Sequence, residues 1–238
     1  MTGLLANALD SIGAQSILIG GTRSLYGNVL TITPAAQQLQ IDSGAVLTAP
    51  EIMLTASTAI TVGAGALIDT TSFGAISTLF PNDPKTGKTL GSIALARVSG
   101  GGAGAFVLAS NAPVLPVTLP AGSGASKLSI GAGAQVLGGG EVALSASNTI
   151  SMDPSARLAA PTVMVSVPVI NFGTGGASGF NLSASLLAQL SEGDPLRNLP
   201  ATGNLVLSAS TAINVYGSVD LGDRKSTRLN SSHQIISY

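Results

Sequence analysis

One arrangement of apolar residues recurs along the chain and limits what it can fold into. Each copy holds two pairs of apolar residues, with one position between the members of a pair and a short Gly-rich or polar stretch between the pairs. Side chains at positions i and i+2 of an extended segment point to the same face, so each pair predicts a short strand with one apolar face. Two successive copies begin at Leu39 and Ile60, and two more begin at Leu128 and Ile150.

A third strand is expected after the two pairs, over residues 51–56 and 142–146. Residues 54–68, 144–158 and 207–221 align without a gap and match at their apolar positions. Periods of this length are typical of solenoids, in which each repeat packs on the next. The sequence therefore predicts an all-β parallel solenoid with about 21–22 residues per coil. The side chains expected in its core are Ile41, Leu47, Leu54, Ile130, Val136, Leu144, Met152, Leu158 and Leu221.

The composition argues against the other fold classes. Charged residues make up 9% of the chain, whereas disordered chains combine high charge with low hydrophobicity. Gly, Ser, Thr or Asn interrupts every apolar run well before it is long enough for a transmembrane helix. A transmembrane barrel needs strands of about 9–11 residues and aromatic girdles, but the predicted strands are shorter and aromatic residues make up only 3%.

We expect residues 1–222 to form a single block with two inserts that leave the repeat. The first insert covers residues 72–91, which contain two prolines and no period-two pattern. The second covers residues 183–203 and predicts a short helix, with Ser183 or Ser185 as its N-cap and Gly193 as its C-cap. The chain begins and ends within repetitive material, so we expect it to be a fragment of a longer solenoid.

Residues 223–238 break the pattern with a polar, basic segment. This segment resembles the translation of a sequencing-library adapter, and we expect it to be a non-native, disordered tail. It contains His233, the only histidine. Without the tail, 7 basic and 10 acidic residues remain, and this net charge of −3 argues against a nucleic-acid partner.

The sequence predicts no catalytic, cofactor-binding or metal-binding residue. The chain has no cysteine and no histidine before the tail. A solenoid enzyme would stack carboxylates and bases at the repeat spacing, but no acidic residue has such a partner one repeat further on. Loops could still bring two groups together, and the candidates for this are Asp83, Lys85 and Lys88 in the first insert and Glu192, Asp194 and Arg197 in the second.

Three segments resemble a known family. ILIGGTRS (17–24), GAVLTAPEIMLTASTAITVGAGALI (44–68) and LSASTAINVYGSVDLG (207–222) are similar to the repeat region of filamentous haemagglutinin-type exoproteins, the secreted partners of bacterial two-partner secretion systems. This resemblance implies a right-handed parallel β-helix that acts as a stalk or adhesive surface. It also implies export through an outer-membrane transporter of a Gram-negative bacterium, a secreted or cell-surface location, and a host-cell or glycan receptor.

Two other functions stay open from the sequence. The first is a carbohydrate-active β-helix enzyme of the polysaccharide lyase or glycosidase type, which would need a groove with stacked acids, bases or aromatic rings. The second is the passenger of an autotransporter, which would have the same shaft and a different exporter. We expect the non-enzymatic role.

Overall fold

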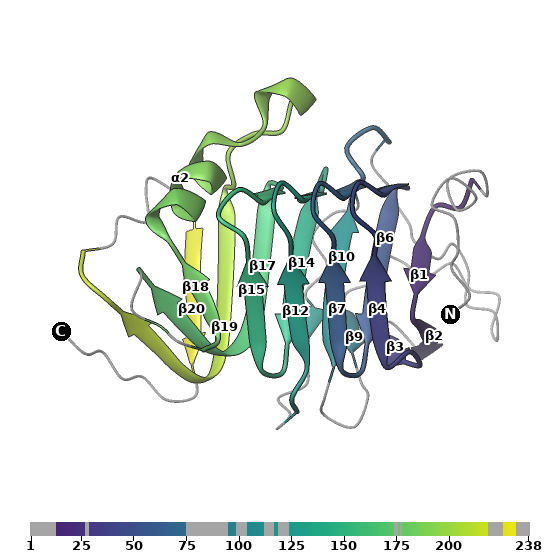
Figure 1. Cartoon of the computed structure of the whole chain (residues 1–238). Coiled ribbons are helices and arrows are strands. Elements are labelled where there is room, and N and C mark those ends of the chain that lie inside the picture. The colour runs from purple at the N-terminus through teal and green to yellow at the C-terminus, as the bar shows by residue number, and fades with distance from the viewer. Residues whose placement is uncertain are drawn as a thin grey trace.

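The structure is a computed structural model that describes residues 13–26, 29–74, 95–98, 104–111, 117–118, 124–173, 176, 178–218 and 226–231. Strands dominate this part of the chain, and most of them lie side by side in a large curled sheet (Figure 1). The fold is therefore all-β, as the sequence predicts. No helix in these ranges is long and apolar enough to cross a membrane.

The repeats supply strands to three faces. The first face consists of β4 (Gln38–Ile41), β7 (Ala59–Val62), β12 (Lys127–Ile130) and β15 (Thr149–Met152). The second face consists of β5 (Val46–Thr48), β8 (Leu67–Asp69), β13 (Gln135–Leu137) and β16 (Arg157–Ala159). The third face contains β6 (Glu51–Ala56), β10 (Ala105–Ser110), β14 (Glu141–Ala146) and the first part of β17 (Thr162–Phe172).

The register on the first two faces is the one that the apolar pattern predicts. Leu39 pairs with Ile60 and Leu128 with Ile150, all in parallel strands. Ile60 also pairs with Leu128, so the first two repeats and the last two join in one stack. On the second face, β5, β8, β13 and β16 pair in sequence order and all run parallel.

The core follows the predicted columns of inward side chains. Seven of the nine predicted residues are buried in one apolar cluster, namely Ile41, Leu47, Leu54, Ile130, Val136, Leu144 and Leu158. Met152 is only partly buried and packs against the edge of that cluster. Leu221 lies outside the described residues.

The corners between the first two faces are formed in two different ways. Gly44, Gly65 and Gly133 occupy equivalent positions with φ between 65° and 69°, a left-handed conformation that glycine adopts without a steric penalty. In the last of these repeats, Ser155 takes the equivalent place. There the Asp153 carboxylate accepts hydrogen bonds from the Ser155 backbone N–H (2.8 Å) and hydroxyl (2.6 Å), so a side chain organises the turn.

The third face departs from the all-parallel pairing of the first two faces. β10 lies between β6 and β14 and runs antiparallel to both, with Ala105 opposite Ala56 and Ser110 opposite Glu51. β10 therefore begins at the end of this face where β6 stops. The alternation of side chains is the same in parallel and antiparallel strands, so Val107 still enters the core between Leu54 and Leu144.

The outward side of the third face is also buried, whereas the sequence predicted strands with one apolar face. Every residue of β6, β10 and β14 is buried, including the outward-pointing Met53, Phe106 and Leu108. A smaller sheet combines β2 (Gly21–Tyr26), β3 (Val29–Pro34), β9 (Leu95–Val98) and β11 (Val117–Thr118). Its strands β2 and β3 contact β6, and Ile32 of β3 is fully buried.

The C-terminal end of the stack departs from the repeat. β18 (Phe180–Leu182) lies between β15 and the last residues of β17, and β19 (Asn204–Val215) pairs in parallel with β17. Between them, α2 (Ala184–Glu192) and the 3₁₀ turn η1 (Pro195–Arg197) cover the end of the second face (Figure 1). The predicted second insert therefore contains the predicted helix. The first insert lies outside the described residues beyond position 74.

The tail differs from its predicted disorder. Its residues Ser226–Ser231 form β20, which pairs in parallel with β19 in the register Asn204 to Ser226. The edge of β19 offers unpaired backbone N–H and C=O groups, and an extended segment of almost any sequence can bond to such an edge. The rest of residues 223–238 lies outside the described residues.

Candidate functional site

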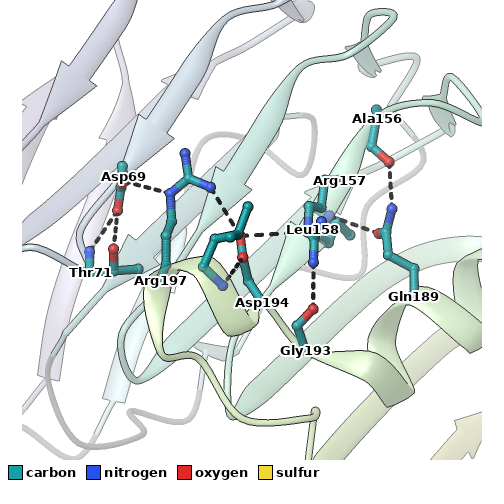
Figure 2. A network of polar contacts seen from close by, with 10 residues as sticks. Asp69, Thr71, Ala156, Arg157, Leu158, Gln189, Gly193, Asp194 and Arg197 are labelled. Carbon is teal, nitrogen blue, oxygen red and sulfur yellow. Dashed lines mark hydrogen bonds and ion pairs between the residues drawn. The ribbon is translucent and has the colours of Figure 1, made fainter.

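Charged side chains gather on the outer surface of the second face, where residues 183–203 cross it (Figure 2). Arg197 Nε lies 3.3 Å from Asp69 Oδ2, and Arg197 Nη1 lies 3.0 Å from Asp194 Oδ2. Arg157 Nε lies 3.7 Å from the same Asp194 oxygen. Two carboxylates and two guanidinium groups therefore form one chain of alternating charge.

The local sequence explains how α2 begins and ends. The Ser183 hydroxyl accepts a hydrogen bond from the Leu186 N–H, so this serine is the N-cap. Gly193 ends the helix with φ of 68°, and a Cβ at this position would lie 2.5 Å from the Pro200 carbonyl carbon. Leu186, Leu187 and Leu190 are buried in the main core, so α2 is anchored by its apolar side.

Asp194 sets the geometry of the turn that follows α2. Its side chain is 1% exposed, and its Oδ1 accepts a hydrogen bond from the Leu196 N–H as the cap of η1. Its backbone forms an antiparallel bridge with Leu199, which packs on Leu137 and Ala159 of the second face. Because both of its oxygens have partners, this carboxylate holds the turn in its conformation.

The side chain of Gln189 contacts the free edge of β16. Its Nε2 donates to the Ala156 carbonyl (3.0 Å), and its Oε1 accepts from the Leu158 N–H (3.1 Å). Arg157 lies between these two residues, and its Nη2 donates to the Gly193 carbonyl (2.5 Å). These contacts fasten the helix along the edge of the strand (Figure 2).

The structure brings together only two of the three candidate residues that the sequence indicates for the second insert. Asp194 and Arg197 are in contact, whereas Glu192 is exposed at the end of α2. The partners that the sequence did not reveal are Asp69 and Arg157, which come from strands far away in the chain. Asp83, Lys85 and Lys88 lie outside the described residues.

A second polar cluster lies on the outward side of the third face. Ser110 of β10 is opposite Glu51 on one side and Glu141 on the other, and all three are buried. The Ser16 and Ser110 hydroxyls donate to the Glu51 carboxylate at 2.6 and 3.2 Å. Burial raises the pKa of the Glu51 carboxyl, although these two hydrogen bonds and the charge of Arg23 act in the opposite direction.

A comparison of residues one repeat apart does not reveal this carboxylate column. Glu51 and Glu141 become second neighbours only because β10 is inserted between their strands. Both side chains lie on a surface that is covered, which leaves them no route to a substrate. The sequence does contain a signal for this cluster, namely a glutamate at the same position of two matching strands.

An open hollow of about 510 Å³ follows the ends of β7, β12 and β15. Its polar lining includes the hydroxyl-bearing side chains of Thr61, Ser129 and Ser151, and Ser129 is paired with Thr61 on one side and with Ser151 on the other. Asp153 is the one carboxylate among the residues that line this hollow in the described part of the chain. Hydrogen bonds from the Ser155 hydroxyl and backbone lower the pKa of Asp153, so it is ionised at neutral pH.

These three places differ in what chemistry they can support. The Asp194 cluster is engaged in internal contacts, and the glutamate column is covered. The hollow offers hydroxyl groups and one ionised carboxylate, whereas hydrolysis of a glycoside typically uses two carboxyl groups, one of them protonated. Within the described ranges, no three His, Cys, Asp or Glu side chains are arranged to hold a metal ion.

Comparison with known proteins adds no relative: no family model, no curated protein and no solved structure matches the chain.

Proposed function

We propose that the chain is a segment of a right-handed parallel β-helix and serves as a structural or adhesive shaft. The observation that carries this proposal is the column that runs through Leu39, Ile60, Leu128 and Ile150 in consecutive parallel strands. A stack held by such columns grows along one axis and depends on contacts between neighbouring repeats. This architecture is suited to a long, stiff element.

The resemblance of residues 17–24, 44–68 and 207–222 to filamentous haemagglutinin-type exoproteins supplies the biological setting. On this proposal, the chain belongs to a large exoprotein that is secreted or held at the surface of a Gram-negative bacterium. Its partners are an outer-membrane two-partner secretion transporter and a host-cell or glycan receptor. A passenger of an autotransporter would use the same shaft with a different exporter.

The competing proposal is a carbohydrate-active β-helix enzyme. The open hollow beside Thr61, Ser129 and Ser151 favours it, because hydroxyl-bearing side chains can bond to a sugar chain. Asp153 is the single carboxylate among the described residues of that hollow, and its ionised state argues against hydrolysis there. We therefore prefer a shaft or an adhesive surface without catalysis.

One experiment separates the two proposals. The purified chain is assayed for release of reducing ends or unsaturated products from acidic and neutral polysaccharides, alongside binding to a glycan array. We expect no turnover by the wild type. Turnover that is lost in Asp153→Asn and retained in the exposed control Glu192→Gln would replace the shaft with the enzyme.

A further inference from the structure

One row of uncharged polar side chains runs along the outward side of the first face. In neighbouring parallel strands, Gln40 pairs with Thr61, Thr61 with Ser129, and Ser129 with Ser151. β15 also pairs with β18, which places Asn181 beside Ser151. Each of these five strands, four of which lie side by side in Figure 1, therefore adds one hydroxyl or amide group to the row.

The hydroxyl groups in the middle of the row are available to a ligand. Thr61 and Ser151 are exposed and Ser129 is half-buried, and none of the three hydroxyls bonds to another described residue. Other hydroxyls of the same repeats are engaged within the protein. The Ser126 hydroxyl donates to the Gly104 carbonyl (2.6 Å), and the Ser155 hydroxyl donates to the Asp153 carboxylate (2.6 Å).

Beyond β15, contacts within the protein close the row. Asn181 Oδ1 accepts from Asn171 Nδ2 (2.9 Å), and Asn181 Nδ2 donates to the Gly176 carbonyl (3.0 Å). A Cβ at Gly176 would collide with the Asn171 side chain, so a glycine is needed where the chain lies over these asparagines. The open part of the row therefore runs from β4 to β15, which is about 14 Å at the usual strand spacing of about 4.8 Å.

The open hollow of about 510 Å³ lies beside the three hydroxyl-bearing residues of the row. Gly63 and Gly131 belong to its lining, and they keep the space open because they have no side chains. Asp153 is the one charged residue among the described residues that line the hollow. The surface beside the row is thus concave, uncharged for most of its length, and negative at one end.

The chemistry of the row limits the class of ligand. Hydroxyl and amide groups donate and accept hydrogen bonds without carrying charge, whereas a nucleic acid needs Lys and Arg for its phosphates. A peptide that joins a sheet needs a free backbone edge, but β7, β12 and β15 are each paired on both sides. A polymer with hydroxyl groups at regular intervals fits the row, and the ionised Asp153 disfavours a negatively charged one.

We propose that this row binds an uncharged linear polysaccharide, which lies along the axis of the stack and crosses β4, β7, β12 and β15. This inference rests on the adhesive role proposed above and names its ligand. Gln40, Thr61, Ser129 and Ser151 supply the hydrogen bonds. The described lining of the hollow contains no aromatic ring for a sugar to stack on, so affinity depends on how many of these bonds one ligand makes. A longer oligosaccharide should therefore bind more tightly than a short one.

Saturation-transfer-difference NMR titrations with the intact chain test the class of ligand. The neutral probes are cello- and manno-oligosaccharides of two and six sugars, and the acidic probe is hexagalacturonate. We expect at least one neutral hexasaccharide to bind at least tenfold more tightly than its disaccharide and than hexagalacturonate. Absence of binding by both neutral hexasaccharides, or equal binding of the disaccharide and the hexasaccharide, contradicts the row as a polysaccharide site.

A row variant tests the residues. The triple change Thr61→Val, Ser129→Ala and Ser151→Ala removes the three hydroxyls, and we expect it to weaken binding of the neutral hexasaccharide at least tenfold. The matched control, Thr22→Val with Ser24→Ala, removes exposed hydroxyls from β2 and should bind like the wild type. Circular dichroism spectra and thermal unfolding check that both variants are folded. Unchanged binding in the folded triple variant contradicts the assignment to this row.

A third measurement needs no substitution and separates this inference from the proposed shaft. In an isotope-labelled wild-type chain, the neutral hexasaccharide should shift the amide signals of Thr61, Ser129 and Ser151 and leave those of β2 unchanged. Shifts confined to another surface contradict the row but are compatible with an adhesive shaft. Hydrolysis of the probe during the titration contradicts the non-catalytic role on which both proposals depend.

Discussion

The guanidinium group of Arg197 lies 3.3 Å from the carboxylate of Asp69, although Asp69 belongs to the second face and Arg197 to the insert that follows β18. Asp69 is in β8, and Arg197 is at the end of η1, which reaches it across β16 and β13. Asp69 also accepts hydrogen bonds from the Thr71 N–H (2.8 Å) and hydroxyl (2.7 Å). One arginine therefore ties the insert to a strand of the second repeat.

Removal of this tie should loosen the insert. Arg197→Ala leaves the carboxylates of Asp69 and Asp194 without one of their charged partners, and we expect a loss of about 1–3 kcal/mol in the free energy of unfolding. Urea denaturation measures the loss, with Glu192→Ala as the exposed control in the same insert. Equal midpoints for the two variants would mean that the tie does not stabilise the fold.

The buried Glu51 should make stability depend on pH. Its pKa in the folded state is raised, so its contribution is complete below the ordinary glutamate pKa of about 4.5 and declines as the pH rises through the raised value. Glu51→Gln removes this decline, and we expect the variant to be at least as stable as the wild type at pH 7. Melting temperatures between pH 4 and pH 8 test this.

Asp153 provides a control for the same series of pH measurements, because its pKa is shifted in the opposite direction. Its pKa is lowered by Ser155, so its contribution is present above the ordinary aspartate pKa and is lost as the pH falls through the lowered value. Asp153→Asn should therefore lower the melting temperature by a similar amount across pH 4 to pH 8, so that its profile runs nearly parallel to that of the wild type. A profile for Glu51→Gln that runs parallel to the wild type from pH 4 to pH 8 would contradict the assignment to Glu51.

Phe106 tests whether the outward side of the third face is covered. Its side chain is 1% exposed even though its neighbours Ala105 and Val107 are the residues that enter the core. Phe106→Ala should cost about 3–5 kcal/mol, the usual range for a buried aromatic side chain. Thr61→Ala, an exposed change on β7, should cost less than about 0.5 kcal/mol. Urea midpoints that agree within error would place Phe106 in solvent.

Replacement by alanine should cost different amounts of stability at two glycines of one corner. A Cβ at Gly63 would lie 2.6 Å from the Ser43 backbone nitrogen, whereas Gly65 has open space and φ of 66°. Gly65→Ala should therefore cost about 1–2 kcal/mol for the left-handed conformation alone. Gly63→Ala forces two backbone corners apart and should reach the upper end of the roughly 1–3 kcal/mol typical of overpacking. The reverse order in thermal unfolding would show that the corners do not stack closely.

The sequence was sufficient to predict the first two faces because their apolar pairs recur in register. Leu39, Ile60, Leu128 and Ile150 carry that signal, and they pair as predicted. The direction of β10 could not be predicted, because the alternation of AFVLAS is the same in a parallel and an antiparallel strand. The covered outer surface had a signal that was overlooked, namely the unbroken apolar run Ile52-Met53-Leu54 in place of strict alternation.

The polar contacts were beyond sequence reasoning for a physical reason. Asp194 and Arg197 lie close in the chain, and their contact could be suspected from spacing. Their partners Asp69 and Arg157 depend on which strands the insert crosses, and no local pattern records that. The role of Gln189 depends in the same way on where the end of α2 meets the edge of β16.

The pairing of β7 with β12 is the most direct test of the stacked repeat, because Thr61 and Ser129 face each other although they are far apart in the chain. The chain has no cysteine, so two introduced cysteines report on one contact. Neighbouring strands lie about 4.8 Å apart, within the Cα separation of about 4.4–6.8 Å that a disulfide spans. Thr61→Cys with Ser129→Cys should form a disulfide in the folded monomer under mild oxidation. Thr61→Cys with Ser151→Cys, one strand further away, should not. No disulfide in the first pair, or an equally rapid disulfide in the second, would contradict the stack on which the proposed shaft depends.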